Sequence, residues 1–138
     1  MDLKRINEHV TVSGQILPED VAALKAAGFT AIINNRPDGE SPDQPASAEI
    51  EAAAKAAGLD YFAIPLGREG VSPEMVEQTR SVLEGSAGPV FAFCRSGTRS
   101  TTLWALSQAG EADAGEIISQ AAEAGYDMSH LAGHLSRS

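Results

Sequence analysis

The fold is decided by residues 89–100, PVFAFCRSGTRS. The first five of these residues form a short apolar run that follows Gly88, which is typical of a buried β-strand. Residues 100–109 repeat apolar side chains at helical spacing, and Gly110 is a suitable end for that helix. We therefore expect a strand, a tight loop that begins with Cys94, and a helix that starts soon after it.

Cys94 is the only cysteine of the chain. Backbone N–H groups of a loop that enters a helix point inward, and the helix dipole adds partial positive charge. Both effects stabilise a thiolate and an oxyanion bound beside it. Arg99 adds a planar, charged group that suits phosphate or thiosulfate-like oxygens. The alternative is a buried apolar cysteine without chemistry, but the polar, arginine-rich surroundings favour a nucleophile in an anion cradle.

Strands and helices alternate along the rest of the chain. We expect strands at residues 9–14, 30–34, 61–64 and 89–93, and helices at residues 18–28, 46–57, 72–83, 100–109, 116–124 and 129–135. This alternation predicts one α/β domain over residues 1–138, with a mainly parallel central sheet flanked by helices. Ligands of such folds bind at the carboxyl ends of the strands, where Cys94 and residues 34–36 are expected to lie.

The composition excludes several classes of partner. A formal net charge of −9 argues against nucleic acid, and no apolar run is long enough for a membrane helix. We expect a cytoplasmic protein, because the N-terminus has no signal-peptide pattern and a lone reactive thiolate suits a reducing compartment. An acidic surface repels anions, so an anion site needs local positive charge. Arg95 and Arg99 supply it, with Arg36 and Arg68 as further candidates.

The chain resembles the bacterial beta-lactamase-hydrolase-like, phosphatase-like domains over nearly its whole length. The resemblance rests on residues 13–15 (SGQ), 34–40 (NNRPDGE), 64–65 (IP), 94–100 (CRSGTRS) and 125–127 (GYD). That family is similar in fold to the dual-specificity protein phosphatases. The resemblance therefore implies a protein-tyrosine-phosphatase-like fold, and the fold alone does not decide the reaction.

The cysteine loop departs from the pattern of those phosphatases, in which five residues separate the cysteine from an arginine and an aspartate protonates the leaving group. Four residues separate Cys94 from Arg99 here, and Ser100 stands where the phosphatase arginine would be. Residues 66–70 contain no aspartate, so Glu69 is the one candidate for a general acid. Loss of a general acid lowers rates by about 100- to 10,000-fold for leaving groups that need a proton.

The same loop resembles that of rhodanese-like sulfurtransferases, which use the shorter spacing. Their thiolate takes sulfane sulfur from thiosulfate or a persulfide, and no acid is needed because sulfite leaves as an anion. Our leading expectation is therefore a sulfurtransferase that works through a Cys94 persulfide. The alternative is a protein tyrosine or dual-specificity-like phosphatase, a phosphoric monoester hydrolase with a Cys94 phosphocysteine. The third hypothesis is a non-catalytic module that binds anions or phosphoproteins.

The two enzymatic hypotheses share the same site residues. Cys94 is the nucleophile, Arg99 binds the anion, and the Ser100 hydroxyl donates a hydrogen bond to the thiolate. The backbone N–H groups of the loop form the cradle, from residues Arg95, Ser96, Gly97 and Thr98. Arg36 either lines the mouth of the site or forms a structural ion pair with Asp38 or Glu40. Glu69 separates the two reactions, because only phosphate hydrolysis calls for its proton.

We expect no metal and no cofactor. His130 and His134 have a spacing that can bind metal on a helix, but the glutamate of the metalloprotease motif is absent between them. The expected substrate is a small sulfur-containing or phosphorylated molecule. The family resemblance adds one expected partner, a metal-dependent hydrolase or dioxygenase encoded nearby.

Overall fold

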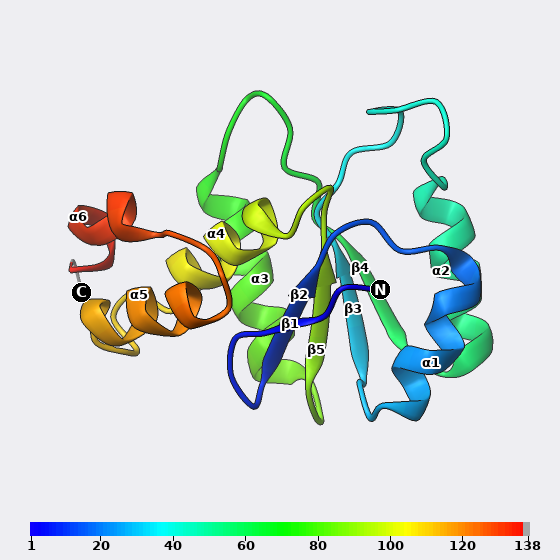
Figure 1. Cartoon of the computed structure of the whole chain (residues 1–138), viewed down its shortest axis with the longest axis horizontal. Helices are drawn as coiled ribbons and strands as arrows, with labels where there is room; N and C mark the ends of the chain where they lie inside the picture. The colour runs from blue at the N-terminus through cyan, green and yellow to red at the C-terminus, as the bar shows by residue number, and fades with distance from the viewer. Residues whose placement is uncertain (137–138) are drawn as a thin grey trace.

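The computed structural model describes residues 1–136 as a sheet covered by helices on both faces (Figure 1). The strands are β1 (Lys4–Arg5), β2 (Val10–Ser13), β3 (Ala31–Asn34), β4 (Asp60–Ala63) and β5 (Val90–Phe93). The helices are α1 (Val21–Ala26), α2 (Ser47–Ala57), α3 (Pro73–Gly85), α4 (Thr98–Ser107), α5 (Ala114–Glu123) and α6 (Ala132–Leu135), with short 3₁₀ turns η1 (Pro18–Asp20) and η2 (Ser129–Leu131). The predicted α/β class with a mainly parallel sheet is confirmed.

The strands lie in the order β1-β2-β5-β3-β4, and all neighbours are parallel except β1 and β2. Strand β5 is therefore central, with β2 on one side and β3 on the other. Its side chains alternate between the two faces of the sheet, Val90 and Ala92 on one and Phe91 and Phe93 on the other. Because β5 is buried on both faces, its sequence is continuously apolar. The two-residue strand β1 was not predicted, because so short a segment carries no alternation.

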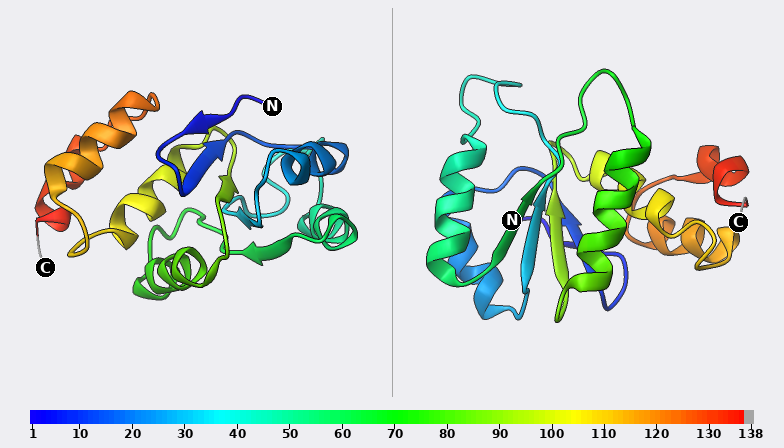
Figure 2. Two further views of the ribbon diagram at one scale, coloured as in Figure 1. Left: turned by 90° about the horizontal axis from the view of Figure 1, so that it is seen from below. Right: turned by 180° about the vertical axis from the view of Figure 1, so that it is seen from behind.

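The helices divide between the faces of the sheet (Figure 2). Helices α1 and α2 pack together over the face that contains Phe91 and Phe93. Helices α3 and α4 cover the other face, and α5 packs against α4 on the side away from the sheet (Figure 1). Among residues 1–136, no helix combines the length and apolar character needed to cross a membrane.

Helix α4 begins at Thr98, two residues earlier than the apolar spacing predicts. The residue before it, Gly97, has a φ of 91° in the left-handed region, which glycine adopts without steric strain. The chain therefore turns from the loop directly into the helix, and Ser100 belongs to the first helical turn. This shift places the N-terminus of the helix beside Cys94.

Candidate active site

The cysteine loop starts from a fixed point at the carboxyl end of β5. The Cys94 N–H donates to the Ser13 carbonyl over 3.3 Å, and the Phe93 carbonyl accepts from the Asn35 N–H over 2.8 Å. Both neighbouring strands thus hold the base of the loop. Gly14 lets the chain after β2 pass close to the cysteine loop, because a Cβ at position 14 would lie 2.8 Å from the Arg95 carbonyl oxygen. The Cys94 side chain is fully buried there.

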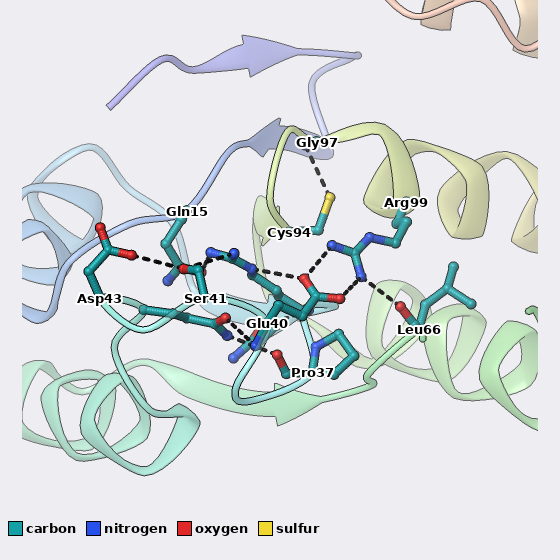
Figure 3. A network of polar contacts seen from close by, with 12 residues as sticks. Gln15, Pro37, Glu40, Ser41, Asp43, Leu66, Cys94, Gly97 and Arg99 are labelled. Atoms are coloured by element: carbon teal, nitrogen blue, oxygen red, sulfur yellow. Dashed lines mark hydrogen bonds and ion pairs between the residues drawn. The ribbon is translucent and has the colours of Figure 1, made fainter. Parts of the chain in front are cut away.

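The sulfur of Cys94 accepts a hydrogen bond from the loop backbone. The Gly97 N–H donates to Sγ over 3.1 Å, at the N-terminus of α4 (Figure 3). A helix N-terminus carries partial positive charge and favours a negative group at this place. Gly97 is thus the member of the predicted cradle that contacts the sulfur, whereas Arg95, Ser96 and Thr98 are exposed around it.

Arg99 is held in a fixed orientation by two acceptors. Its Nη1 and Nη2 donate to the two carboxylate oxygens of Glu40, each over 2.8 Å, and Nη1 also donates to the Leu66 carbonyl over 2.8 Å (Figure 3). The pKa of Arg99 is raised, first by the hydrogen bond to Glu40 and further by the nearby charge of a Cys94 thiolate. The guanidinium therefore stays charged beside the sulfur.

Arg36 does not line the mouth of the site. Its side chain is 5% exposed, and Nε donates to Glu40 over 2.9 Å. Nη1 and Nη2 donate to the Gln15 amide oxygen and the Ser41 hydroxyl, over 3.1 and 3.4 Å. Arg36 thus makes the structural ion pair with Glu40 that the sequence offered as one alternative, because folding of the following loop surrounds the guanidinium with acceptors. Anion binding by Arg36 stays a prediction.

A cavity of about 720 Å³ opens in front of the cysteine loop. It is lined by Pro37, Gly39, Glu40, Pro65, Gly67, Arg68, Glu69, Arg95 and Arg99. The predicted anion-binding arginines, Arg95 and Arg99, and the predicted acid, Glu69, thus face one space. Cys94 is fully buried and is not itself part of this lining. A second hollow of about 650 Å³, between β4 and α3, is lined mainly by apolar atoms and contains no candidate nucleophile.

Ser100 does not make the predicted hydrogen bond to the thiolate. Its hydroxyl is buried in the first turn of α4 and has no hydrogen-bond partner among the described residues. The sulfur accepts from the Gly97 N–H, one of the predicted cradle groups. A buried hydroxyl without a partner is uncommon in proteins, and the catalytic role of Ser100 stays a prediction.

Glu40 is the residue that the sequence reasoning missed as part of the site. It joins the loop after β3 to the cysteine loop, because one carboxylate accepts from both Arg36 and Arg99. The Leu66 carbonyl was missed as well. Its position follows from Asn35, whose carbonyl accepts from the Leu66 N–H over 3.0 Å and whose side chain donates to the Ile64 carbonyl over 2.9 Å. The polar run of residues 34–40 is the one signal that could have marked Glu40.

The two arginines lower the pKa of Glu40 from 4.5 to about 2, with the Arg99 hydrogen bond as the largest cause. A carboxyl group whose pKa is depressed by folding stabilises the protein above its unfolded pKa and ceases to do so as it is protonated. The contribution of Glu40 is therefore complete above pH 4.5 and is lost as the pH falls toward 2.

We expect Glu40→Gln to have a lower free energy of unfolding than the wild-type protein at neutral pH. This gap in free energy should close as the pH falls from 4.5 toward 2. Urea unfolding of both proteins across this range measures the gap. Glu77→Gln is the control, because Glu77 pairs with Arg80 through an exposed carboxylate on α3. A gap that stays constant with pH would contradict the depressed pKa of Glu40.

Similarity to known proteins extends over most of the chain. Residues 2–111 match the model of the family described as beta-lactamase hydrolase-like protein, phosphatase-like domain. The beta-lactamase hydrolase-like protein of Agrobacterium fabrum is 42% identical over 109 residues, which are 79% of this chain and 25% of that protein. That of Xylella fastidiosa is 32% identical over 139 residues, 99% of this chain and 32% of the relative. The chain thus spans a quarter to a third of the length of these relatives.

Several solved structures share the fold of this chain. The crystal structure of a candidate phosphatase from Neisseria meningitidis has a TM-score of 0.82 and 32% identity, and the match covers 99% of this chain and 97% of the other. TpbA of Pseudomonas aeruginosa shares the fold, with a TM-score of 0.66 at 17% identity over 99% of this chain and 81% of that one. These findings favour the phosphatase alternative over the sulfurtransferase that the loop spacing led us to expect. The chain belongs to the family of beta-lactamase hydrolase-like, phosphatase-like domains.

Proposed function

We propose that this domain hydrolyses phosphate monoesters through a Cys94 phosphocysteine. The observation that carries the proposal is the pairing of Cys94 with Arg99. The sulfur is held by the Gly97 N–H at the N-terminus of α4, and the charged guanidinium lies beside it in the wall of the cavity. The membership of a phosphatase-like family supports the same reaction.

The hydrogen bonds of Arg99 leave one edge of its guanidinium for a substrate. A guanidinium has five N–H donors in a planar fork. Glu40 takes the edge between Nη1 and Nη2, and the Leu66 carbonyl takes the other Nη1 proton. Two N–H groups remain among the described contacts, one on Nε and one on Nη2, and they form the second edge of the fork. That edge suits two oxygens of one phosphoryl group.

The reaction that we propose has two steps. The Cys94 thiolate attacks phosphorus, so that a P–S bond forms as the bond from phosphorus to the ester oxygen breaks. Arg99 holds the phosphoryl oxygens, and the α4 N-terminus stabilises their charge. Water then attacks the phosphocysteine, which releases inorganic phosphate and returns the electron pair of the P–S bond to sulfur.

The ester oxygen that leaves in the first step needs a proton. Glu69 is exposed and lines the same cavity as Arg99, which supports it as the acid of this step. Aryl esters depend least on such an acid, because phenolate is a better leaving group than an alkoxide. We therefore propose aryl phosphates, which include phosphotyrosine chemically, as the substrates that the site cleaves best.

The burial of Cys94 bears on the choice between an enzyme and a binding module. A sulfur that is fully buried is what the non-catalytic hypothesis predicts, because substrate must reach Sγ to react. The exposed Arg95 side chain lines the cavity next to the buried sulfur, and a surface side chain can move without unfolding the sheet. The proposal therefore requires that the Arg95 side chain move aside as a phosphoryl group binds, while Arg99 keeps its hydrogen bonds to Glu40 and Leu66.

The test is intact-protein mass spectrometry of rapidly quenched mixtures with an aryl phosphate, run beside a matched mixture with thiosulfate. We expect a gain of one phosphoryl group with the aryl phosphate, together with release of phosphate, and no adduct in the Cys94→Ser variant. A gain of one sulfur atom from thiosulfate without phosphate release would instead establish the sulfurtransferase. Saturable binding of phosphate with neither adduct would establish the binding module.

A further inference from the structure

The C-terminal segment reaches the cysteine loop through Tyr126. The Tyr126 hydroxyl donates to the Ser96 carbonyl over 2.9 Å. Tyr126 lies outside residues 2–111, which the family model covers. The contact joins positions 30 residues apart in the sequence. It brings a side chain from beyond α5 onto the backbone of the loop that contains the nucleophile.

The peptide that Tyr126 holds is the one that contacts the sulfur. The Ser96 carbonyl and the Gly97 N–H belong to a single peptide group, which is trans. In a trans peptide these two groups point in opposite directions. Tyr126 binds the carbonyl, and the N–H donates to Cys94 Sγ over 3.1 Å. Rotation of this peptide would break both hydrogen bonds together, so the bond from Tyr126 opposes loss of the bond to the sulfur.

The contact is tight enough to require glycine at position 97. A Cβ built on Gly97 would collide with the Tyr126 hydroxyl, and the φ of 91° independently disfavours any side chain there. The phenol therefore packs directly on the backbone of the Ser96–Gly97 peptide. Any larger residue at position 97 would push Tyr126 away from the loop.

Tyr126 is itself held in place by α5. Its N–H donates to the Ala121 carbonyl over 2.9 Å, and Ile117 and Ala121 are buried in the core beside α4 (Figure 1). The pKa of Tyr126 is raised by burial and further by the charge of a Cys94 thiolate, so the hydroxyl keeps its proton and remains a donor. An anchored donor restrains the peptide more than a solvent molecule does.

We propose that Tyr126 is a positioning residue, which fixes the Ser96–Gly97 peptide with its N–H directed at Cys94 and so favours the thiolate. Its effect on turnover rests on the proposed phosphatase function. Its effect on the ionisation of Cys94 does not rest on that function, because this ionisation can be measured without any substrate. Cys94 is the only cysteine, so a thiolate signal reports this site alone.

The test compares Tyr126→Phe with Tyr61→Phe, the two tyrosines of the chain. Tyr61 is the matched control, because its hydroxyl bonds to Asn34 and Ser47, over 2.9 and 2.7 Å, and makes no hydrogen bond to residues 94–100. Thiolate absorbance in the ultraviolet is recorded against pH, with Cys94→Ser as the blank. Tyr126→Phe is expected to fold, since Ser96 is exposed and water can replace the phenol at its carbonyl.

We expect the pH midpoint of thiolate formation to rise in Tyr126→Phe and to stay unchanged in Tyr61→Phe. With an aryl phosphate, kcat is expected to fall roughly three- to tenfold in Tyr126→Phe, with little change in KM, as loss of one neutral hydrogen bond allows. An unchanged midpoint in Tyr126→Phe would overturn the inference. A raised midpoint in a protein that releases no phosphate would sustain it and refute the proposed function instead.

Discussion

Replacement of Cys94 by serine is expected to lower the rate of aryl phosphate hydrolysis by more than about a thousandfold, because removal of the covalent nucleophile abolishes the catalysed path. A serine hydroxyl at this position is a poor nucleophile, since its pKa lies far above that of a thiol and it stays protonated at neutral pH. Steady-state phosphate release measures the effect.

Cys94→Ser should leave the fold and the anion cradle intact, because serine has nearly the shape of cysteine and the Gly97 N–H can donate to its oxygen. Thermal melting and binding of vanadate are the controls. Full activity in Cys94→Ser would show that the sulfur takes no part in the reaction. Saturable binding of vanadate with no activity in either protein would favour the binding module.

Arg99→Lys is expected to lower kcat/KM by about 100- to 1,000-fold, even though it preserves the charge. A lysine amine is a point donor, which cannot bond both oxygens of Glu40 and the Leu66 carbonyl while it offers a flat edge to a phosphoryl group. Kinetics with an aryl phosphate measure the loss, which should appear in both kcat and KM.

Arg80→Lys is a closely matched control for Arg99→Lys. Arg80 also pairs with one carboxylate, that of Glu77, and with one backbone carbonyl, that of Ser107. The side chains of the two arginines are equally exposed, at 26%. Arg80 lies on α3, away from the cavity lining. If both substitutions reduced activity alike, the role of Arg99 would be structural and the proposed oxygen-binding edge would be refuted.

The strand before Cys94 could be predicted because its signal is local. The apolar run of residues 89–93 and the helical pattern after it both follow from neighbours in sequence, and they place the cysteine correctly at the sheet edge. The family resemblance was confirmed in the same way, since its motifs are contiguous. The early start of α4 was missed because the conformation of Gly97, and not apolar spacing, sets it.

The contacts that complete the site could not be predicted, because they join distant parts of the chain. Arg99 and Glu40 are 59 positions apart, and Ser96 and Tyr126 are 30 apart. Charge alone made Arg36 a further candidate beside Arg99. Folding separates them, since one is enclosed by the loop after β3 and the other faces the cavity. The shorter cysteine loop likewise pointed to sulfur transfer, which the comparisons do not support.

The two walls of the cavity differ in how they are fastened. One wall is the cysteine loop, which follows the central strand β5 directly. Its base is hydrogen-bonded through the backbone to the segments on both sides. The opposite wall, residues 37–40, is tied to the protein mainly by side chains, through the Glu40 carboxylate and through the Asp38 carboxylate, which accepts from the Ser47 N–H. Backbone ladders in a sheet centre open rarely, whereas side-chain contacts of loops open often. We therefore expect the segment that contains Glu40, and not the cysteine loop, to move when substrates of different size bind.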